Sequence, residues 1–118
     1  MKFNNIEQAI LTFKENAELH GKATLNGEYK NVNKSYKEIK KAKDFLISLN
    51  KLDSLECLLD DSSISVVSWA ASYLLFSEKY SKLSQKKLEE ISSNSGILAS
   101  DARQILKEWG LGNLTLEN

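Results

Sequence analysis

The sequence predicts an all-α protein of about six helices in three antiparallel pairs, arranged as a HEAT-like α-solenoid. Apolar residues recur at three- and four-residue steps along most of the chain, which is the helical period. No convincing run of alternating apolar and polar residues marks a strand, and the 118 residues include no proline, which permits long helices without proving them. Short turns separate the helical patterns, so neighbouring helices should pair and bury their apolar faces. Because identity between the pairs is poor, the pattern indicates a solenoid-like stack and not a demonstrated repeat.

The first helix is expected from about Asn5 to Leu19, where the apolar residues lie on one face. Asn4 or Asn5 can cap its start, because the side-chain oxygen accepts a backbone amide that lacks a partner. Gly21 is expected just beyond the end of this helix, and Lys22–Tyr29 is expected to be a loop.

A longer second helix is expected from Val32 to Leu49. Its apolar stripe contains Val32, Tyr36, Ile39, Ala42, Leu46 and Leu49. Its opposite face is rich in lysine, with Lys34, Lys37, Lys40, Lys41 and Lys43. Asp53 or Ser54 can then cap a short third helix, whose apolar residues are Leu55, Leu58 and Leu59.

A fourth helix, from about Ile64 to Phe76, is apolar around most of its circumference, which is typical of a central buried helix. Ser84 can cap an amphipathic helix over residues 85–91. The last helix is expected from Leu98 to Trp109, with Trp109 in the core, and Gly110 suits the left-handed residue that ends many helices. Residues 1–118 are expected to form one domain, in which 1–4 and 111–118 are short terminal segments.

Composition argues against several classes of protein. The 16 Lys and Arg residues balance 16 Asp and Glu residues, which weighs against a nucleic-acid-binding protein. Cys57 is the only cysteine, so the chain can form neither an internal disulfide nor a cysteine-based zinc site. The N-terminus lacks the apolar core of a signal peptide, and no apolar run is long enough to cross a bilayer. We therefore expect a cytoplasmic protein that has no membrane partner.

Candidate catalytic residues are few. His20 is the only histidine and could act as a general base or a metal ligand, but no other His, Cys or carboxylate stands at a convincing spacing from it. The favoured interpretation is structural: at the end of the first helix, an imidazole can meet unpaired carbonyls. Cys57 has acidic neighbours that would raise its thiol pKa, and a structural cysteine in an apolar row is expected. The sequence therefore predicts no enzyme, no cofactor and no metal site.

Charge is distributed unevenly along the chain. Between Leu52 and Glu78 there is no Lys or Arg, whereas the second helix is rich in lysine. Regions of opposite charge can steer association with a partner, although a solvated helix face and polar turns explain the same pattern equally well. Trp69 flanks the apolar row of the fourth helix, so it is either a binding anchor or a core residue. The candidate partner-binding residues are Asp53, Glu56, Asp60, Asp61 and Trp69.

Several strings together resemble a small bacterial family catalogued as domain of unknown function two thousand and nineteen. The most distinctive are His20-Gly21-Lys22-Ala23 and Trp69-Ala70-Ala71-Ser72-Tyr73-Leu74-Leu75, and weaker matches extend to Gly112-Asn113-Leu114. The resemblance covers nearly the whole chain and implies a short HEAT-type helical domain. Val67 is a departure, because HEAT repeats often carry Arg at this position, so any electrostatic ladder between repeats is in doubt.

The helical pattern and the lack of catalytic motifs predict a non-enzymatic protein-binding module. Similar small helical proteins occur beside contact-dependent and polymorphic toxin genes as candidate immunity proteins, so the expected partner is a cognate bacterial toxin domain, for example a nuclease. An acidic patch suits this role, because it can occupy a groove built for phosphates. Two alternatives stay open: a nucleic-acid-associated adaptor that uses the lysine-rich second helix, and a helical scaffold of unrelated bacterial function.

Overall fold

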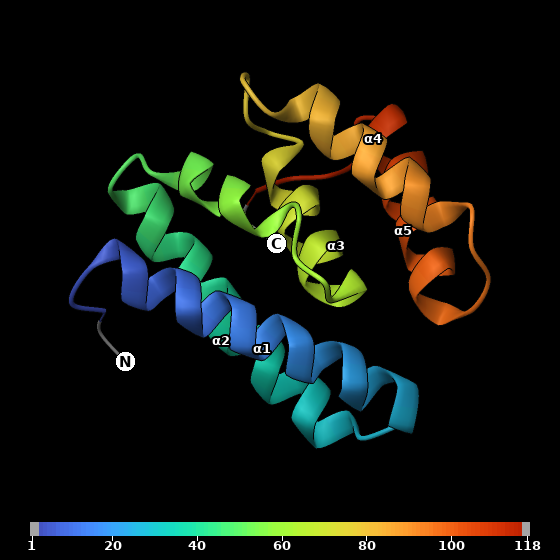
Figure 1. Cartoon of the computed structure of the whole chain (residues 1–118), viewed down its shortest axis with the longest axis horizontal. Helices are drawn as coiled ribbons and strands as arrows, with labels where there is room; N and C mark the ends of the chain where they lie inside the picture. The colour runs from blue at the N-terminus through green and yellow to red at the C-terminus, as the bar shows by residue number, and fades with distance from the viewer. Residues whose placement is uncertain (1–2, 117–118) are drawn as a thin grey trace.

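A computed structural model describes residues 3–116 (Figure 1). It contains five α-helices and one 3-10 helix, in the order α1 (Ile6–Asn26), α2 (Tyr29–Ser48), η1 (Leu52–Leu58), α3 (Ile64–Leu74), α4 (Ser81–Ser92) and α5 (Ile97–Gly110). Within residues 3–116 there is no strand, and the all-α prediction is confirmed. The predicted terminal segments are described only in part, because residues 1–2 and 117–118 lie outside the described residues. None of the helices in the described range combines the length and apolar character needed to span a bilayer.

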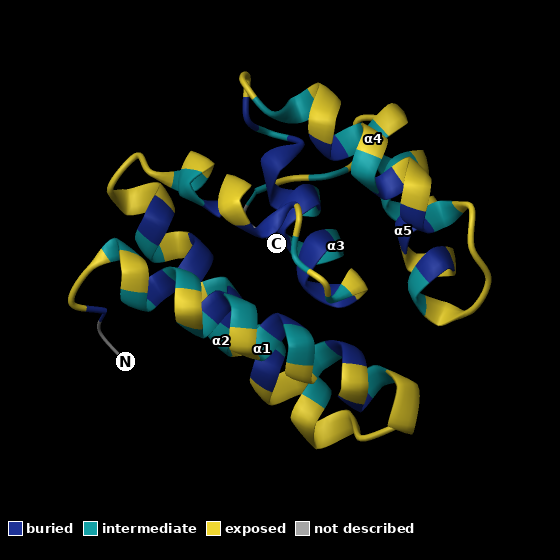
Figure 2. Cartoon of the chain, in the orientation of Figure 1, coloured by how far each residue is buried: buried dark blue, intermediate teal, exposed yellow. Residues whose placement is uncertain are grey.

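Helix α3 lies at the centre of the arrangement. The α1–α2 hairpin packs on one side of it and the α4–α5 hairpin packs on the other (Figure 1). Most residues of α3 are buried, as the dark segments of Figure 2 show. The prediction of a central buried helix is therefore confirmed, while the HEAT-like solenoid arrangement stays a prediction.

Helix α1 is longer than the sequence predicts, because it continues to Asn26. Gly21 lies inside the helix, and Gly27 ends it with a left-handed φ of 69°. The position of Gly21 is explained by the crossing of α1 and α3: a Cβ atom added there would lie 2.5 Å from Ser65 Oγ. Ser65 Oγ in turn donates a hydrogen bond of 2.7 Å to the carbonyl of Ala17. The expected helix end at Gly21 is therefore wrong, since this glycine permits a close contact between helices.

The helix starts are predicted with mixed success. Asn5 caps α1 by accepting a hydrogen bond from the backbone amide of Gln8, as expected. Helix α4 begins before Ser84, and the Ser84 side chain is fully buried, so the expected cap there is wrong. The third helix begins at Leu52 without a side-chain cap, and α2 begins at Tyr29, three residues before the expected start.

Lys43 departs from the predicted lysine face, because its side chain is fully buried. Its Nζ donates to the carbonyl of Leu116 at 2.5 Å, pairs with the Asp44 carboxylate at 2.8 Å and lies 5.4 Å from the ring centroid of Tyr73. A buried ammonium group is tolerated when such partners replace its water shell. Leu114 and Leu116 also pack against the core. The described part of the C-terminal segment, residues 111–116, is thus part of the fold and not the short tail that the sequence predicts.

Candidate functional site

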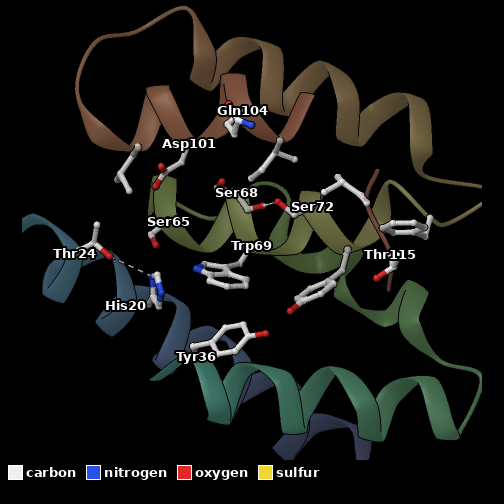
Figure 3. A pocket seen from close by; sticks show the side chains of 15 residues that line it. His20, Thr24, Tyr36, Ser65, Ser68, Trp69, Ser72, Asp101, Gln104 and Thr115 are labelled. Atoms are coloured by element: carbon white, nitrogen blue, oxygen red, sulfur yellow. Dashed lines mark hydrogen bonds between the residues drawn. The ribbon is translucent and has the colours of Figure 1, made fainter. Parts of the chain in front are cut away.

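An open cavity of about 400 Å³ lies between α3 and the elements around it (Figure 3). Helix α1 contributes His20 and Thr24, α2 contributes Tyr36, and α5 contributes Asp101 among other residues. The complete lining also includes Ser65, Ser68, Trp69, Ser72, Tyr73, Phe76, Leu98, Gln104, Ile105, Leu114 and Thr115. The volume and the largely apolar wall are typical of a site for a small molecule.

The α3 wall of the cavity has a recognisable sequence pattern. Its lining residues recur at helical steps, so they share one face of the helix: Ser65, Ser68, Trp69, Ser72 and Tyr73. Serine is small, and its presence beside two large rings leaves space that leucine or isoleucine would fill. The row of serines on an otherwise apolar helix is the sequence feature that could have indicated a cavity. The sequence alone does not show that the neighbouring helices leave this space open.

Trp69 occupies the centre of an aromatic cluster within the cavity. Its ring centroid lies 5.0 Å from that of His20, 6.1 Å from that of Tyr36 and 6.0 Å from that of Tyr73. Ring pairs at such distances stabilise one another beyond the effect of burial alone. Trp69 is half-buried, and it is therefore a fixed wall of the cavity and not an isolated surface anchor.

His20 lies within α1 and not at its end, so the expected contact with unpaired terminal carbonyls is wrong. Its Nδ1 atom is 3.4 Å from Thr24 Oγ1. Burial lowers the pKa of His20, and the nearby charge of Asp101 opposes that shift. Desolvation raises the pKa of Asp101, while His20 opposes that rise. At neutral pH the cavity therefore contains a neutral imidazole and one carboxylate.

The cavity offers hydrogen bonding, ring stacking and a single negative charge. Among the hydrogen bonds of the described residues, none joins His20 to Asp101. Across the described range, no group of three or more His, Cys, Asp or Glu residues could hold a metal ion. The hydroxyl group of Tyr73 is buried and has no hydrogen-bond partner among residues 3–116, although such groups usually have one.

The predicted acidic residues lie away from this cavity, on η1 and the loop that precedes α3. Asp53 and Glu56 are both exposed. Residues three positions apart in a 3-10 helix share one face, so these two carboxylates lie one above the other. Neither takes part in a salt bridge within the described part of the chain.

Asp60 and Asp61 are paired with lysines from distant helices. Asp60, which is 85% exposed, accepts a hydrogen bond of 3.0 Å from Lys87. Asp61, which is 13% exposed, pairs with Lys14 at 3.3 Å and accepts the Ser63 backbone amide at 3.0 Å. The side chain of Asp61 therefore orders the turn before α3. Residues 52–78 contain no Lys or Arg, and these two carboxylates pair with lysines from other parts of the chain.

The structure divides the predicted partner-binding residues into two groups. A second, more open hollow of about 320 Å³ is lined by Asp60 and Asp61 together with Ile64 and Val67 of α3. Trp69 faces the aromatic cavity, which lies along a different side of α3. The candidate set Asp53, Glu56, Asp60, Asp61 and Trp69 therefore does not form one continuous site.

Cys57 is exposed, so the expectation that it packs in an apolar row is wrong. Partial burial and the charge of Glu56 raise the pKa of the thiol, which is the direction expected from its acidic neighbours. Its Sγ atom donates to the carbonyl of Ser54 at 3.3 Å. Nothing around this thiol activates it as a nucleophile.

No family model, curated protein or solved structure matches the chain. The resemblance to the bacterial helical family stays a prediction, and function has to be argued from the geometry of the cavity and of the acidic residues.

Proposed function

We propose that this chain is a non-enzymatic protein-binding module, and that it recognises a basic partner through its acidic segment. The acidic segment is defined here as Asp53, Glu56 and Asp60. The observation that supports the proposal most strongly is the exposed pair Asp53 and Glu56, one turn apart and free of salt bridges within residues 3–116. These carboxylates are available to cations of a partner.

The backbone beneath the acidic segment is anchored in the core. Leu55 and Leu58 of η1 are buried, and Leu59 is buried directly after the helix. A segment held in this way presents its charges with little loss of conformational entropy on binding. Exposed charges of this kind mainly increase the rate of association and select between partners.

The proposed partner is a bacterial toxin domain with a basic, phosphate-binding groove, such as a nuclease, which the chain would neutralise in the cytoplasm as an immunity protein. The support is the combination of the exposed carboxylates with the predicted family resemblance. A groove that binds phosphates attracts carboxylates for the same electrostatic reason.

The proposal is tested with the toxin domain encoded beside the gene for this chain. Co-expression should restore growth, and the purified proteins should bind. The double variant Asp53→Lys/Glu56→Lys should weaken binding about tenfold or more and slow association, most strongly at low salt. Rates and affinities are measured by surface plasmon resonance at two salt concentrations.

The matched control is Glu15→Lys/Glu28→Lys, which makes the same change in net charge at two exposed positions away from the acidic segment, one in α1 and one in the turn before α2. This control should bind within about twofold of the wild type, a change of less than ~0.5 kcal/mol. Equal losses in both variants would mean that only net charge matters. If the neighbouring gene product is neither toxic nor bound, the immunity role is rejected.

A second candidate function is supported by the outer face of α2. Lys30, Lys34, Lys37 and Lys41 are all exposed and recur at steps of four, three and four residues, so they lie in a row. Lys41 is paired with Glu38 at 3.3 Å. This row could follow a phosphate backbone, and binding would then decline steeply with salt. Absence of fluorescence-anisotropy binding to a DNA duplex at about 0.05 M salt would exclude it.

A further inference from the structure

The aromatic cavity is separate from the acidic segment, and its chemistry points to a different ligand. Trp69 and Tyr73 of α3 line it together with Phe76, which lies just after α3, and Tyr36 of α2 faces Trp69. Figure 3 shows Tyr36 and Trp69 projecting toward the same space. A cavity with several ring faces binds flat apolar groups and also attracts cations.

Among residues 3–116, Asp101 is the only carboxylate that lines this cavity, and no Lys or Arg of that range lines it. His20 is neutral at neutral pH, because burial lowers its pKa. The nearby ammonium of Lys43 does not belong to the lining and is paired with Asp44. The electrostatic character of the cavity is therefore negative. Asp101 is an exposed residue whose carboxyl group is partly desolvated, and it has no salt bridge in the described part of the chain.

The Tyr73 ring contributes to the wall of the cavity, but its hydroxyl group does not. Tyr73 is 5% exposed and lines the cavity, yet its hydroxyl group has no hydrogen-bond partner among the described residues. Buried hydroxyl groups are normally paired, because an unpaired one loses its bonds to water without replacement. This hydroxyl group is closed off from the cavity, because its oxygen has less than 1 Å² of accessible area, and it is therefore not counted among the groups that recognise a ligand.

We propose that this cavity is a binding site for a small organic cation with an aromatic body, of the class of the arylalkyl amines. The aromatic body stacks on Trp69, and the ammonium group pairs with the Asp101 carboxylate. The site does not depend on the acidic segment, because it is built from other elements. A protein partner and a small ligand could therefore bind the chain independently.

The site is tested with three probes of similar size and different charge: 2-phenylethylammonium, 2-phenylethanol and phenylacetate. In a Trp109→Phe background, Trp69 is the sole tryptophan, so its fluorescence reports on the cavity. We expect a saturable change with 2-phenylethylammonium at an affinity about tenfold higher than that of 2-phenylethanol, and the weakest binding with phenylacetate.

Two variants separate charge recognition from general binding. Asp101→Asn should weaken binding of 2-phenylethylammonium about tenfold and leave binding of 2-phenylethanol within about twofold. The control Asp53→Asn removes an exposed carboxylate outside the cavity and should change neither affinity. Tyr73→Phe, which removes a hydroxyl group that is closed off from the cavity, should also leave both affinities within about twofold.

The possible results decide the proposal in either direction. Equal affinities for the cation and the alcohol, or equal effects of Asp101→Asn and Asp53→Asn, would overturn the preference for a cation. Tighter binding of phenylacetate would overturn it as well. If no probe gives a saturable change up to about 10 mM, which corresponds to negligible affinity, the cavity is not a ligand site. Thermal melting of every variant confirms that it is folded. If Asp101→Asn is unfolded, the order of affinities for the three probes, measured on protein that keeps Asp101, provides an independent answer.

Discussion

Gly21 is the residue whose replacement most directly tests the packing of α1 against α3. In the variant Gly21→Ala, the new Cβ atom would lie 2.5 Å from Ser65 Oγ and 2.6 Å from Ser65 Cβ. Contacts between carbon atoms are normally about 3.5 Å or longer. The two helices must therefore move apart, or Ser65 must change its rotamer and lose its hydrogen bond of 2.7 Å to the Ala17 carbonyl.

The expected magnitude follows from three contributions. Overpacking of a buried contact costs about 1–3 kcal/mol, and loss of the serine hydrogen bond costs about 0.5–1.5 kcal/mol. Alanine in place of glycine within a helix contributes about 0.8–1 kcal/mol of stabilisation. The net free energy of unfolding should decrease by roughly 0.5–3.5 kcal/mol, which lowers Tm by at least about 2 °C in a domain of this size.

Urea and thermal unfolding followed by circular dichroism measure this change. Gly110→Ala is the matched control, because its Cβ would meet nothing within 4 Å and its φ is not positive. That variant should be neutral or slightly stabilised. The double variant Gly21→Ala/Ser65→Gly should recover part of the lost stability, because it removes the atoms that clash. If Gly21→Ala is as stable as Gly110→Ala, the close crossing of the two helices is refuted.

Three further predictions concern buried or paired charges. Lys43→Ala should lower the free energy of unfolding by roughly 2–3 kcal/mol. It should also increase amide hydrogen exchange at residues 114–116, because the contact with Leu116 is lost. Unchanged exchange at these residues would contradict the anchoring role of Lys43. The lowered pKa of His20 means that the unfolded chain binds a proton more readily, so stability should fall as the pH drops below about 6.5, and His20→Gln should reduce this dependence between about pH 7 and 5. A pH profile that is the same in both proteins would count against a buried neutral imidazole. Asp61→Ala should lower the free energy of unfolding by about 1–2 kcal/mol, since it removes the acceptor for the Ser63 amide and the ion pair with Lys14. Asp60→Ala is the control and should leave urea unfolding unchanged. Equal effects of the two substitutions would contradict the structural role of Asp61.

The sequence by itself determined the helical class and the approximate place of most helices. Periodic apolar residues define one face of each helix, and this information is local. The central position of α3 was also predictable, because a helix that is apolar around most of its surface has to be enclosed. The Asn5 cap could also be predicted, because its hydrogen bond is made to a residue of the same helix, three positions away.

Tertiary structure decided the features that depend on neighbours distant in sequence. Gly21 has the local pattern of a helix end, yet the approach of Ser65 explains it. Lys43 follows the pattern of an exposed lysine face, yet the returning C-terminal segment and Tyr73 enclose it. Lys14 and Lys87 pair with acidic residues that have no cation nearby in the sequence. The cavity around Trp69 likewise exists only because residues from several helices meet there, and periodicity along one helix contains no information about the space between helices.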